Sequence, residues 1–86
     1  MSESVRESAE LVDRVREVVA AVCRVDVATV GVDDDFADDL GIDSLAKLEL
    51  IVQIERAFGI RLADEQAAAL GSVADVVAEL TPDRAH

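Results

Sequence analysis

Apolar side chains recur at helical spacing over the first quarter of the chain, and this pattern restricts the fold more than any other feature. Spacings of three, four and seven residues join Ala9 to a series of valines at Val5, Val12, Val15, Val19 and Val22. Such spacings place the side chains on one face of a helix. Ser4 and Glu7 have the form of a capping box. We therefore predict a helix from about residue 5 to about residue 23, with the valine face in the core.

Three further helices are predicted downstream, covering about residues 44–58, 64–70 and 73–80. The first ends at Gly59, which suits a left-handed helix stop. Asp64 is placed to be the N-cap of the second. Ser72 and Asp75 have the spacing of a capping box at the start of the third.

A long connection, residues 24–43, separates the first two helices. Its segment 25–30 alternates like a strand, but no second strand is visible to pair with it, so we expect a loop with one helical turn. Residues 81–86 are expected to form a tail. The fold class predicted for 1–86 is all-α: a single domain with an ordered core over about 5–80, built as a small bundle of three main helices and one short helix.

The composition excludes several classes of function. Half the residues are hydrophobic, but there are two Phe, no Trp and no Tyr, so no aromatic platform exists for stacking bases. The net charge is −11, from 19 acidic and 8 basic residues. Because such a field repels phosphate backbones and anionic lipid surfaces, neither nucleic acid nor a membrane is expected as a partner. A protein with a basic docking patch is the natural complement.

The single cysteine and the absence of long apolar runs indicate the compartment. Cys23 cannot form an internal disulfide and lies beside the valine stripe, so it is interpreted as a small core residue rather than a reactive thiol. No apolar run approaches the roughly 18–20 residues that span a bilayer, and the N-terminus lacks a signal-peptide layout. We expect a soluble cytoplasmic monomer, and Met1 with the short tails favours a discrete protein.

The helix predicted over 44–58 carries two apolar stripes. One is suited to the core and consists of Leu50, Ile54 and Phe58, with Ile51 and Ala57 beside them. The other is interleaved with Glu49, Glu55 and Arg56 and consists of Leu45, Leu48 and Val52. A surface helix needs only one buried stripe. Position alone leaves two interpretations open: loops cover the second stripe, or it is a docking face with apolar contacts and an acidic rim.

Ser44, at the start of that helix, has several conceivable roles. An activated serine needs a general base, usually a histidine. The only histidine is His86, at the end of the expected tail, and the glycines of a nucleophile elbow are absent. We therefore expect no catalytic residue and no enzyme. Since Asp and Ser are both good helix caps, Ser44 as a simple N-cap remains open.

The acidic stretch before Ser44 is a poor match to a calcium loop. It contains Asp33, Asp34, Asp35, Asp38 and Asp39. A helix-loop-helix calcium site needs glycine at its sixth position and glutamate at its twelfth. Counted from Asp33, these positions hold Asp38 and Ser44. No dedicated metal site is expected.

The residues around Ser44 resemble those of the acyl carrier protein family. That family has a Leu-Gly-x-Asp-Ser-Leu core, which reads Leu40-Gly41-Ile42-Asp43-Ser44-Leu45 here, followed by a hydrophobic-Glu-Leu step at Leu48-Glu49-Leu50. Phe36 and Asp39-Leu40 match its Phe-x-x-Asp-Leu pattern. The similarity covers roughly residues 12–80. The correct spacing of all these parts makes the match specific, whereas the Asp-Ser-Leu triplet alone is weak.

The resemblance implies a carrier function. Ser44 would accept 4′-phosphopantetheine from coenzyme A through a separate phosphopantetheinyl transferase, and Asp43 resembles the family residue that helps to organise this loading. The thiol of the arm would hold acyl groups as thioesters in fatty-acid, polyketide or related biosynthesis. Acyltransferases, ketosynthases or other acyl-processing enzymes with basic patches would read a face formed by Leu45, Leu48, Glu49, Val52 and Glu55.

Some positions depart from the family pattern. Ala63 stands where many relatives have proline, and Lys47, Gln53 and Arg56 make the helix less acidic than in primary fatty-acid carriers. The second difference favours a specialised pathway. The azimuth of Lys47 points toward the core side of the helix. Two alternatives are an aminoacyl or peptidyl carrier and a non-carrier acidic interaction module in which Ser44 is only a cap.

Overall fold

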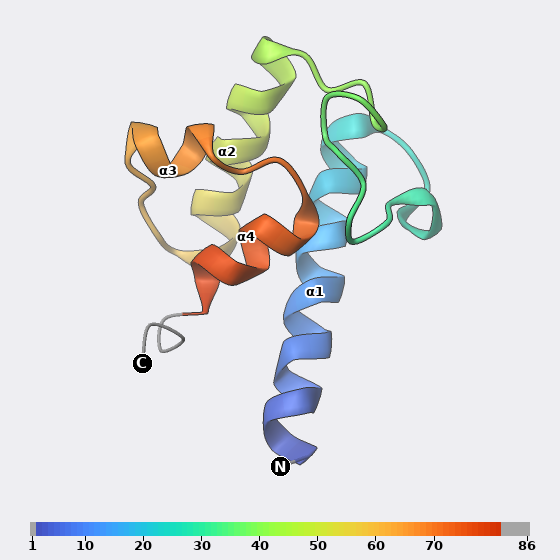
Figure 1. Ribbon diagram of the computed structural model, residues 1–86, viewed down its shortest axis with the longest axis vertical. Helices are drawn as coiled ribbons and strands as arrows, with labels where there is room; N and C mark the ends of the chain where they lie inside the picture. The colour runs from blue at the N-terminus through green and yellow to red at the C-terminus, as the bar shows by residue number, and fades with distance from the viewer. Residues whose placement is uncertain (1, 82–86) are drawn as a thin grey trace.

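The computed structural model describes the backbone of residues 2–81 and the side chains of residues 9–81. The elements are α1 (Ser2–Cys23), the 3-10 turn η1 (Val27–Thr29), α2 (Ser44–Phe58), α3 (Asp64–Ala68) and α4 (Val73–Leu80). In Figure 1, α1 and α2 are the two long helices that run roughly vertically, α4 crosses between them, and α3 lies on the side of α2 that faces away from α1. The predicted all-α bundle of three main helices and one short helix is confirmed, as is the long loop after the first helix.

Helix α1 begins earlier than the sequence indicated. It starts at Ser2, so Ser4 lies within the helix and the predicted capping box at Ser4 is wrong. Neither glycine nor proline occurs in residues 2–8 to stop a helix from extending to the N-terminal side. Most of the predicted tail, residues 82–86 with His86, lies outside the described residues. No helix within residues 2–81 is both long and apolar enough to cross a membrane.

The core is aliphatic and is built where α1 meets α2 and α4. The predicted valine face of α1 is buried, with Val15 and Val19 fully inaccessible to solvent. The other fully buried side chains come from α2, α4 and the long loop: Leu50, Ile54, Val73, Val76 and Val30. Cys23 is half-buried against this cluster, as predicted, and burial raises the pKa of its thiol. The thiol therefore remains protonated at neutral pH and is a poor nucleophile.

Helix α1 ends with a non-glycine residue in the left-handed region. Arg24 has φ 61°, and the amide of Val25 donates to the carbonyl of Ala20 at 3.0 Å, which closes a Schellman-type end. A side chain with a Cβ is strained in this conformation, whereas glycine is not.

Replacing Arg24 by glycine is therefore expected to stabilise the chain. The left-handed conformation disfavours a non-glycine residue by about 1 kcal/mol, and removing that strain raises Tm by roughly 4–8 °C in a domain of this size. Thermal unfolding followed by circular dichroism measures the change. Arg24→Ala removes the same charge but keeps the Cβ, so its Tm is expected to stay near the wild-type value. Equal Tm gains in both variants would show that charge, and not backbone strain, is responsible.

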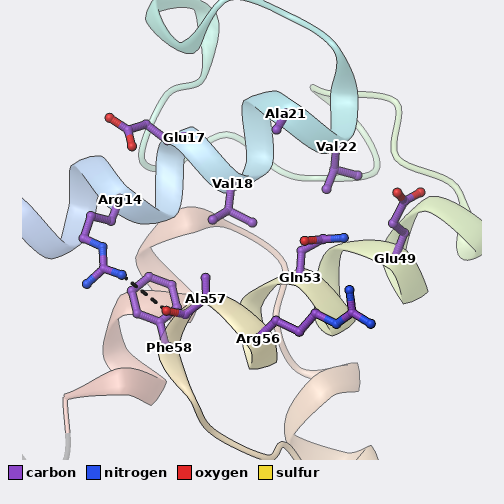
Figure 2. A pocket seen from close by; sticks show the side chains of 10 residues that line it. All are labelled: Arg14, Glu17, Val18, Ala21, Val22, Glu49, Gln53, Arg56, Ala57 and Phe58. Carbon is purple, nitrogen blue, oxygen red and sulfur yellow. Dashed lines mark hydrogen bonds between the residues drawn. The ribbon is translucent and has the colours of Figure 1, made fainter.

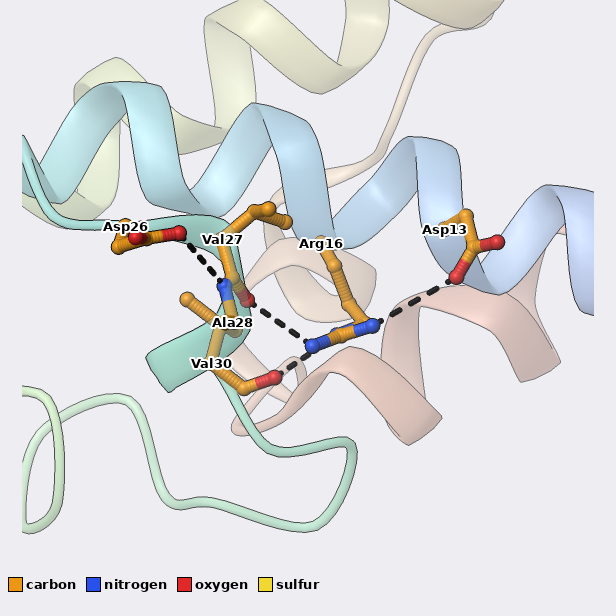
Figure 3. Close-up of polar contacts among 6 residues, drawn as sticks. All are labelled: Asp13, Arg16, Asp26, Val27, Ala28 and Val30. Atoms are coloured by element: carbon orange, nitrogen blue, oxygen red, sulfur yellow. Dashed lines mark hydrogen bonds and ion pairs between the residues drawn. The ribbon is translucent and has the colours of Figure 1, made fainter.

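The first half of the long loop is attached to α1 through Arg16 (Figure 3). Its guanidinium donates to the carbonyl of Val30 at 2.8 Å and to that of Val27 at 2.9 Å. The same group pairs with Asp13 at 3.6 Å. Asp26 caps the 3-10 turn by accepting from the amide of Ala28 at 3.1 Å. These contacts account for an ordered path over a connection of this length.

The second half of the loop uses its own carboxylates to satisfy its amides. Asp34 accepts from Gly31 at 2.9 Å, and Asp39 accepts from the amide of Asp35 at 2.7 Å. Asp35 accepts from both Ala37 and Asp38 at 2.9 Å. Three of the five crowded carboxylates thus stabilise the turns of the loop. Across the described part of the chain, no group of three or more acidic, histidine or cysteine side chains is placed to hold a metal ion.

The ends of the shorter helices agree only partly with prediction. Gly59 ends α2 with φ 65°, as expected. Asp64 is the first residue of α3 and not its N-cap, which is Ala63; the helix ends at Ala68, short of the predicted 70. Ala63 offers no side-chain cap, and the side chain of Gln66 instead accepts from the amide of Ala63 itself at 2.8 Å.

Helix α4 has the predicted bounds and the predicted serine cap. The hydroxyl of Ser72 accepts from the amide of Asp75 at 3.2 Å. The carboxylate of Asp75 reaches back to the amide of Gly71 at 2.9 Å, one residue beyond the partner expected in a capping box. This bond fixes the connection between α3 and α4, against which the long loop packs.

Candidate functional site

Asp43, and not Ser44, caps helix α2. Asp43 has extended backbone angles, and its side chain accepts from the amide of Ala46 at 2.9 Å. Ser44 is the first residue of the helix and its side chain is exposed. The interpretation of Ser44 as a simple cap is therefore wrong, because the neighbouring carboxylate already performs that role. The hydroxyl of Ser44 is left accessible for another function.

The loop that leads to Ser44 is held in place by Phe36. Its side chain is 2% exposed, its amide donates to the carbonyl of Gly71 at 2.8 Å, and its carbonyl accepts from Ile42 at 2.8 Å. Gly41 adopts φ 69° where the chain turns into the helix. One buried ring and two backbone bonds thus fix the approach to Ser44 against the connection between α3 and α4.

A hollow of about 230 Å³ opens beside Ser44. Its lining combines apolar and charged groups: Asp35, Phe36, Ala37, Ile42, Asp43, Ser44, Lys47, Leu70 and Gly71. Lys47 is half-buried here, one turn beyond Ser44. The position of Lys47 on the helix predicted that it points toward the core side. The sequence did not predict that Lys47 lines the same hollow as Ser44, which depends on how the loop folds.

A larger groove of about 610 Å³ lies between α1 and α2 and does not include Ser44 (Figure 2). The guanidinium of Arg14 lies 4.7 Å from the centre of the Phe58 ring and donates to the carbonyl of Ala57 at 3.3 Å. Ala57 is exposed, although it was predicted beside the core stripe. We place the functional site at the smaller hollow because it contains the accessible hydroxyl.

The second apolar stripe of α2 faces outward. Leu45 is 76% exposed, Leu48 64% and Val52 44%, and Glu49 among them is exposed as well. The interpretation that loops cover this stripe is therefore wrong. On the opposite side, Leu50, Ile51 and Ile54 are buried as predicted. Helix α2 thus presents a row of large apolar side chains to solvent directly after Ser44.

Glu55, expected on the same outer face, has a second role that the sequence did not indicate. Its carboxylate accepts from the amide of Leu62 at 2.8 Å and is only partly exposed. This bond ties the end of α2 to the connection that leads to α3. A contact across seven residues depends on the path of the loop and leaves no periodic signal in the sequence.

We expect Glu55→Ala to destabilise the chain by about 1–2 kcal/mol, because the partly buried amide of Leu62 loses a charged acceptor. Urea unfolding measures the change. Glu49→Ala is the matched control: it removes the same charge from the same helix, but Glu49 is exposed and makes no side-chain hydrogen bond to the described residues. Equal stability of the two variants would contradict the structural role of Glu55.

The donors around Ser44 suit a phosphate ester. Asp43 occupies the amide of Ala46, which leaves the amides of Ser44 and Leu45 as the free donors of the first turn. These amides, the positive end of the helix dipole and Lys47 all favour an anion at this position. Among residues 9–81 there is no histidine to activate the hydroxyl.

Comparison with known proteins agrees with this chemistry. Residues 13–80 match the family described as "Phosphopantetheine attachment site". The chain is 39% identical over 69 residues to the acyl carrier protein of Rhodococcus erythropolis, covering 80% of this chain and 76% of the relative. It is 43% identical over 61 residues to polyketide-8 synthase acyl carrier protein 2 of Streptomyces avermitilis, covering 71% of this chain and 70% of the relative.

A third relative is the acyl carrier protein of Rickettsia bellii, which is 45% identical over 51 residues, 59% of each chain. The cofactor of this family is 4′-phosphopantetheine, and its members are carriers rather than enzymes. They are modified by a phosphopantetheinyl transferase and interact with biosynthetic enzymes. Because the family match extends over residues 13–80 and two acyl carrier proteins of 39% and 43% identity align with 80% and 71% of its length, the chain belongs to the acyl carrier protein family.

Proposed function

We propose that Ser44 is the residue that carries 4′-phosphopantetheine in this chain. The observation that carries the proposal is the division of roles at the helix start: Asp43 caps the helix, and the exposed hydroxyl of Ser44 remains free beside unpaired amides. When bound, the group supplies a thiol that holds acyl intermediates as thioesters.

In the loading reaction, the oxygen of Ser44 forms a bond to the phosphorus next to the pantetheine of coenzyme A. The bond from that phosphorus to adenosine 3′,5′-bisphosphate breaks, and the serine proton passes to a base of the transferase. The carrier contributes position only: Asp43 fixes the first turn of α2, and the buried ring of Phe36 with its two backbone hydrogen bonds fixes the preceding loop. We expect the transferase and its magnesium to supply the activation, since the described residues contain no histidine and the carboxylate of Asp43 already accepts from the amide of Ala46.

Intact mass spectrometry tests the proposal. The chain is incubated with coenzyme A, Mg²⁺ and a promiscuous phosphopantetheinyl transferase, alongside a carrier protein known to accept the group. We expect the mass to increase by one phosphopantetheine. No increase under conditions that load the control carrier would contradict the proposal and favour an acidic interaction module.

We further propose that partner enzymes with basic docking patches bind the outer face of α2, formed by Leu45, Leu48, Glu49, Val52 and Glu55. Exposed leucines on a chain of net charge −11 support this assignment, because apolar contacts provide affinity and the acidic rim guides association. Glu55 is expected to contribute less than Glu49, since its carboxylate is already bonded to Leu62.

Glu49→Lys is expected to weaken productive contact with the transferase without unfolding the chain. Reversing one charge at an interface rim changes the association rate, which we expect to fall about tenfold at low salt and less at high salt. Loading rates at two ionic strengths measure the effect, and Tm measures the fold. A large drop in Tm with an unchanged loading rate would contradict the assignment of the outer face.

For the pathway, we propose fatty-acid, polyketide or related biosynthesis. The relative of 43% identity named as a polyketide synthase acyl carrier protein supports a specialised pathway, as do the basic residues Lys47 and Arg56 on α2. Acyltransferases and ketosynthases are the corresponding partner classes. Transfer of malonyl, acetyl and aminoacyl groups to the loaded chain by purified activating enzymes separates acyl from aminoacyl carriers.

A further inference from the structure

Lys47 is a basic side chain in an unusual place. It lies three residues after Ser44, a spacing that puts two side chains on the same face of a helix. Both residues line the hollow of about 230 Å³ at the start of α2. Lys47 is half-buried in this hollow, whereas most charged side chains of the described chain are exposed.

The ammonium of Lys47 has no carboxylate partner among the described side chains. The one ion pair in residues 9–81 joins Arg16 to Asp13. Two carboxylates share the hollow with Lys47, but both accept backbone hydrogen bonds: Asp35 from Ala37 and Asp38, and Asp43 from Ala46. In a chain of net charge −11, a half-buried cation without a paired anion is an exception.

A phosphodiester on Ser44 would add a further negative charge within this hollow. The neighbouring Asp35 and Asp43 would repel it, and the chain as a whole carries the same sign. The free amides of the first turn offset part of that repulsion. The remaining group of opposite charge that lines the hollow is Lys47.

We propose that Lys47 is a positioning residue for the phosphopantetheine arm, its ammonium pairing with the phosphodiester at Ser44. The inference rests on the proposed function of Ser44. Pairing would hold the root of the arm toward the hollow between the acidic loop and α2, and away from the exposed leucines of the outer face. Lys47 would therefore influence where the arm starts, while partner enzymes bind Leu45 and Leu48.

A thermodynamic cycle tests the pairing without any acyl-transfer assay. Apo and loaded forms of the wild type and of Lys47→Gln are unfolded in urea at low ionic strength, and intact mass confirms complete loading of each sample. An ion pair that remains partly accessible to solvent is weak. We therefore expect loading to change the folding equilibrium constant of Lys47→Gln about threefold less favourably than that of the wild type.

Two variants make the result specific. Arg61→Gln removes the same charge from an exposed residue that does not line the hollow, so it should show no coupling to loading. Lys47→Arg keeps the cation and should keep the coupling. If loading changed the unfolding equilibrium equally in Lys47→Gln and Arg61→Gln, the pairing would be overturned, because the effect would then come from the net charge of the chain alone. Loss of coupling in Lys47→Arg as complete as in Lys47→Gln would also overturn it, because packing would then be the cause.

The failure of this inference can be told apart from failure of the proposed function. If the wild-type chain gains no phosphopantetheine, both fail together. If the wild-type chain gains the group and Ser44→Ala does not, the attachment site stands. If Lys47→Gln then shows no coupling to loading, the role of Lys47 is refuted.

Discussion

Ser44→Ala is expected to reduce phosphopantetheine loading to the background level while leaving the fold unchanged. The substitution removes the only atom that can form the ester, so no slower route through the same site remains. Ser44 is exposed, and no side-chain hydrogen bond joins its hydroxyl to the described residues. Surface substitutions of this kind alter the free energy of unfolding by less than about 0.5 kcal/mol. Intact mass after incubation with the transferase, together with urea unfolding, measures both quantities.

Ser72→Ala is the matched control for that experiment. Ser72 also stands at a helix start, but its hydroxyl caps α4 by accepting from Asp75. We expect this variant to lose about 1 kcal/mol of stability and to load normally. The two serines should thus show opposite behaviour. A Ser44→Ala chain that still gains the group, or that unfolds as readily as Ser72→Ala, would contradict the roles assigned here.

Phe36→Ala is expected to cause the largest loss of stability. Truncating a buried phenylalanine costs about 3–5 kcal/mol through lost burial and the cavity left behind. Small domains have total stabilities toward the lower end of about 5–15 kcal/mol, so a large fraction of the molecules would unfold. The effect would reach the site because Phe36 also bonds through its backbone to Gly71 and Ile42. Urea unfolding followed by circular dichroism measures the loss.

Phe58→Ala provides the comparison for Phe36. Phe58 is the other phenylalanine of the chain, but it is only half-buried and lies at the groove between α1 and α2. Its contact with Arg14 is a cation–π pair of about 0.5–1 kcal/mol at an exposed position. We expect a clearly smaller loss of stability than for Phe36→Ala. Equal losses would show that the buried ring of Phe36 is not the main anchor of the loop.

The helices could be predicted from the sequence because each carries a local signal. The valine face of α1, the αL stop at Gly59 and the cap at Ser72 follow from spacing and residue type. The start of α1 was misplaced because Ser4 resembles a cap even where the helix continues past it. Asp64 was misassigned for a similar reason: a carboxylate suits the first turn of a helix as well as its N-cap, and Asp64 lies in the first turn.

The sequence motif was enough to identify Ser44 as the candidate attachment residue, but it did not predict which residues surround Ser44 in space. Residues 36 and 71 meet through a backbone hydrogen bond that no local pattern encodes. The hollow shared by Ser44 and Lys47 exists only because that contact folds the loop against the connection between α3 and α4. Likewise, Leu45 and Leu48 are exposed because the long loop does not pack over them. The path of that loop could not be predicted from the sequence, which therefore left open whether loops cover this stripe or whether it is a docking face.

Locating the modified atom tests the central claim most directly. The loaded chain is digested, and tandem mass spectrometry assigns the phosphopantetheine to one residue. We expect a single modified peptide in which the group is attached to Ser44 and to no other serine. A chain that remains unmodified after purification from cells containing its transferase, or that carries the group on another residue, would contradict the claim.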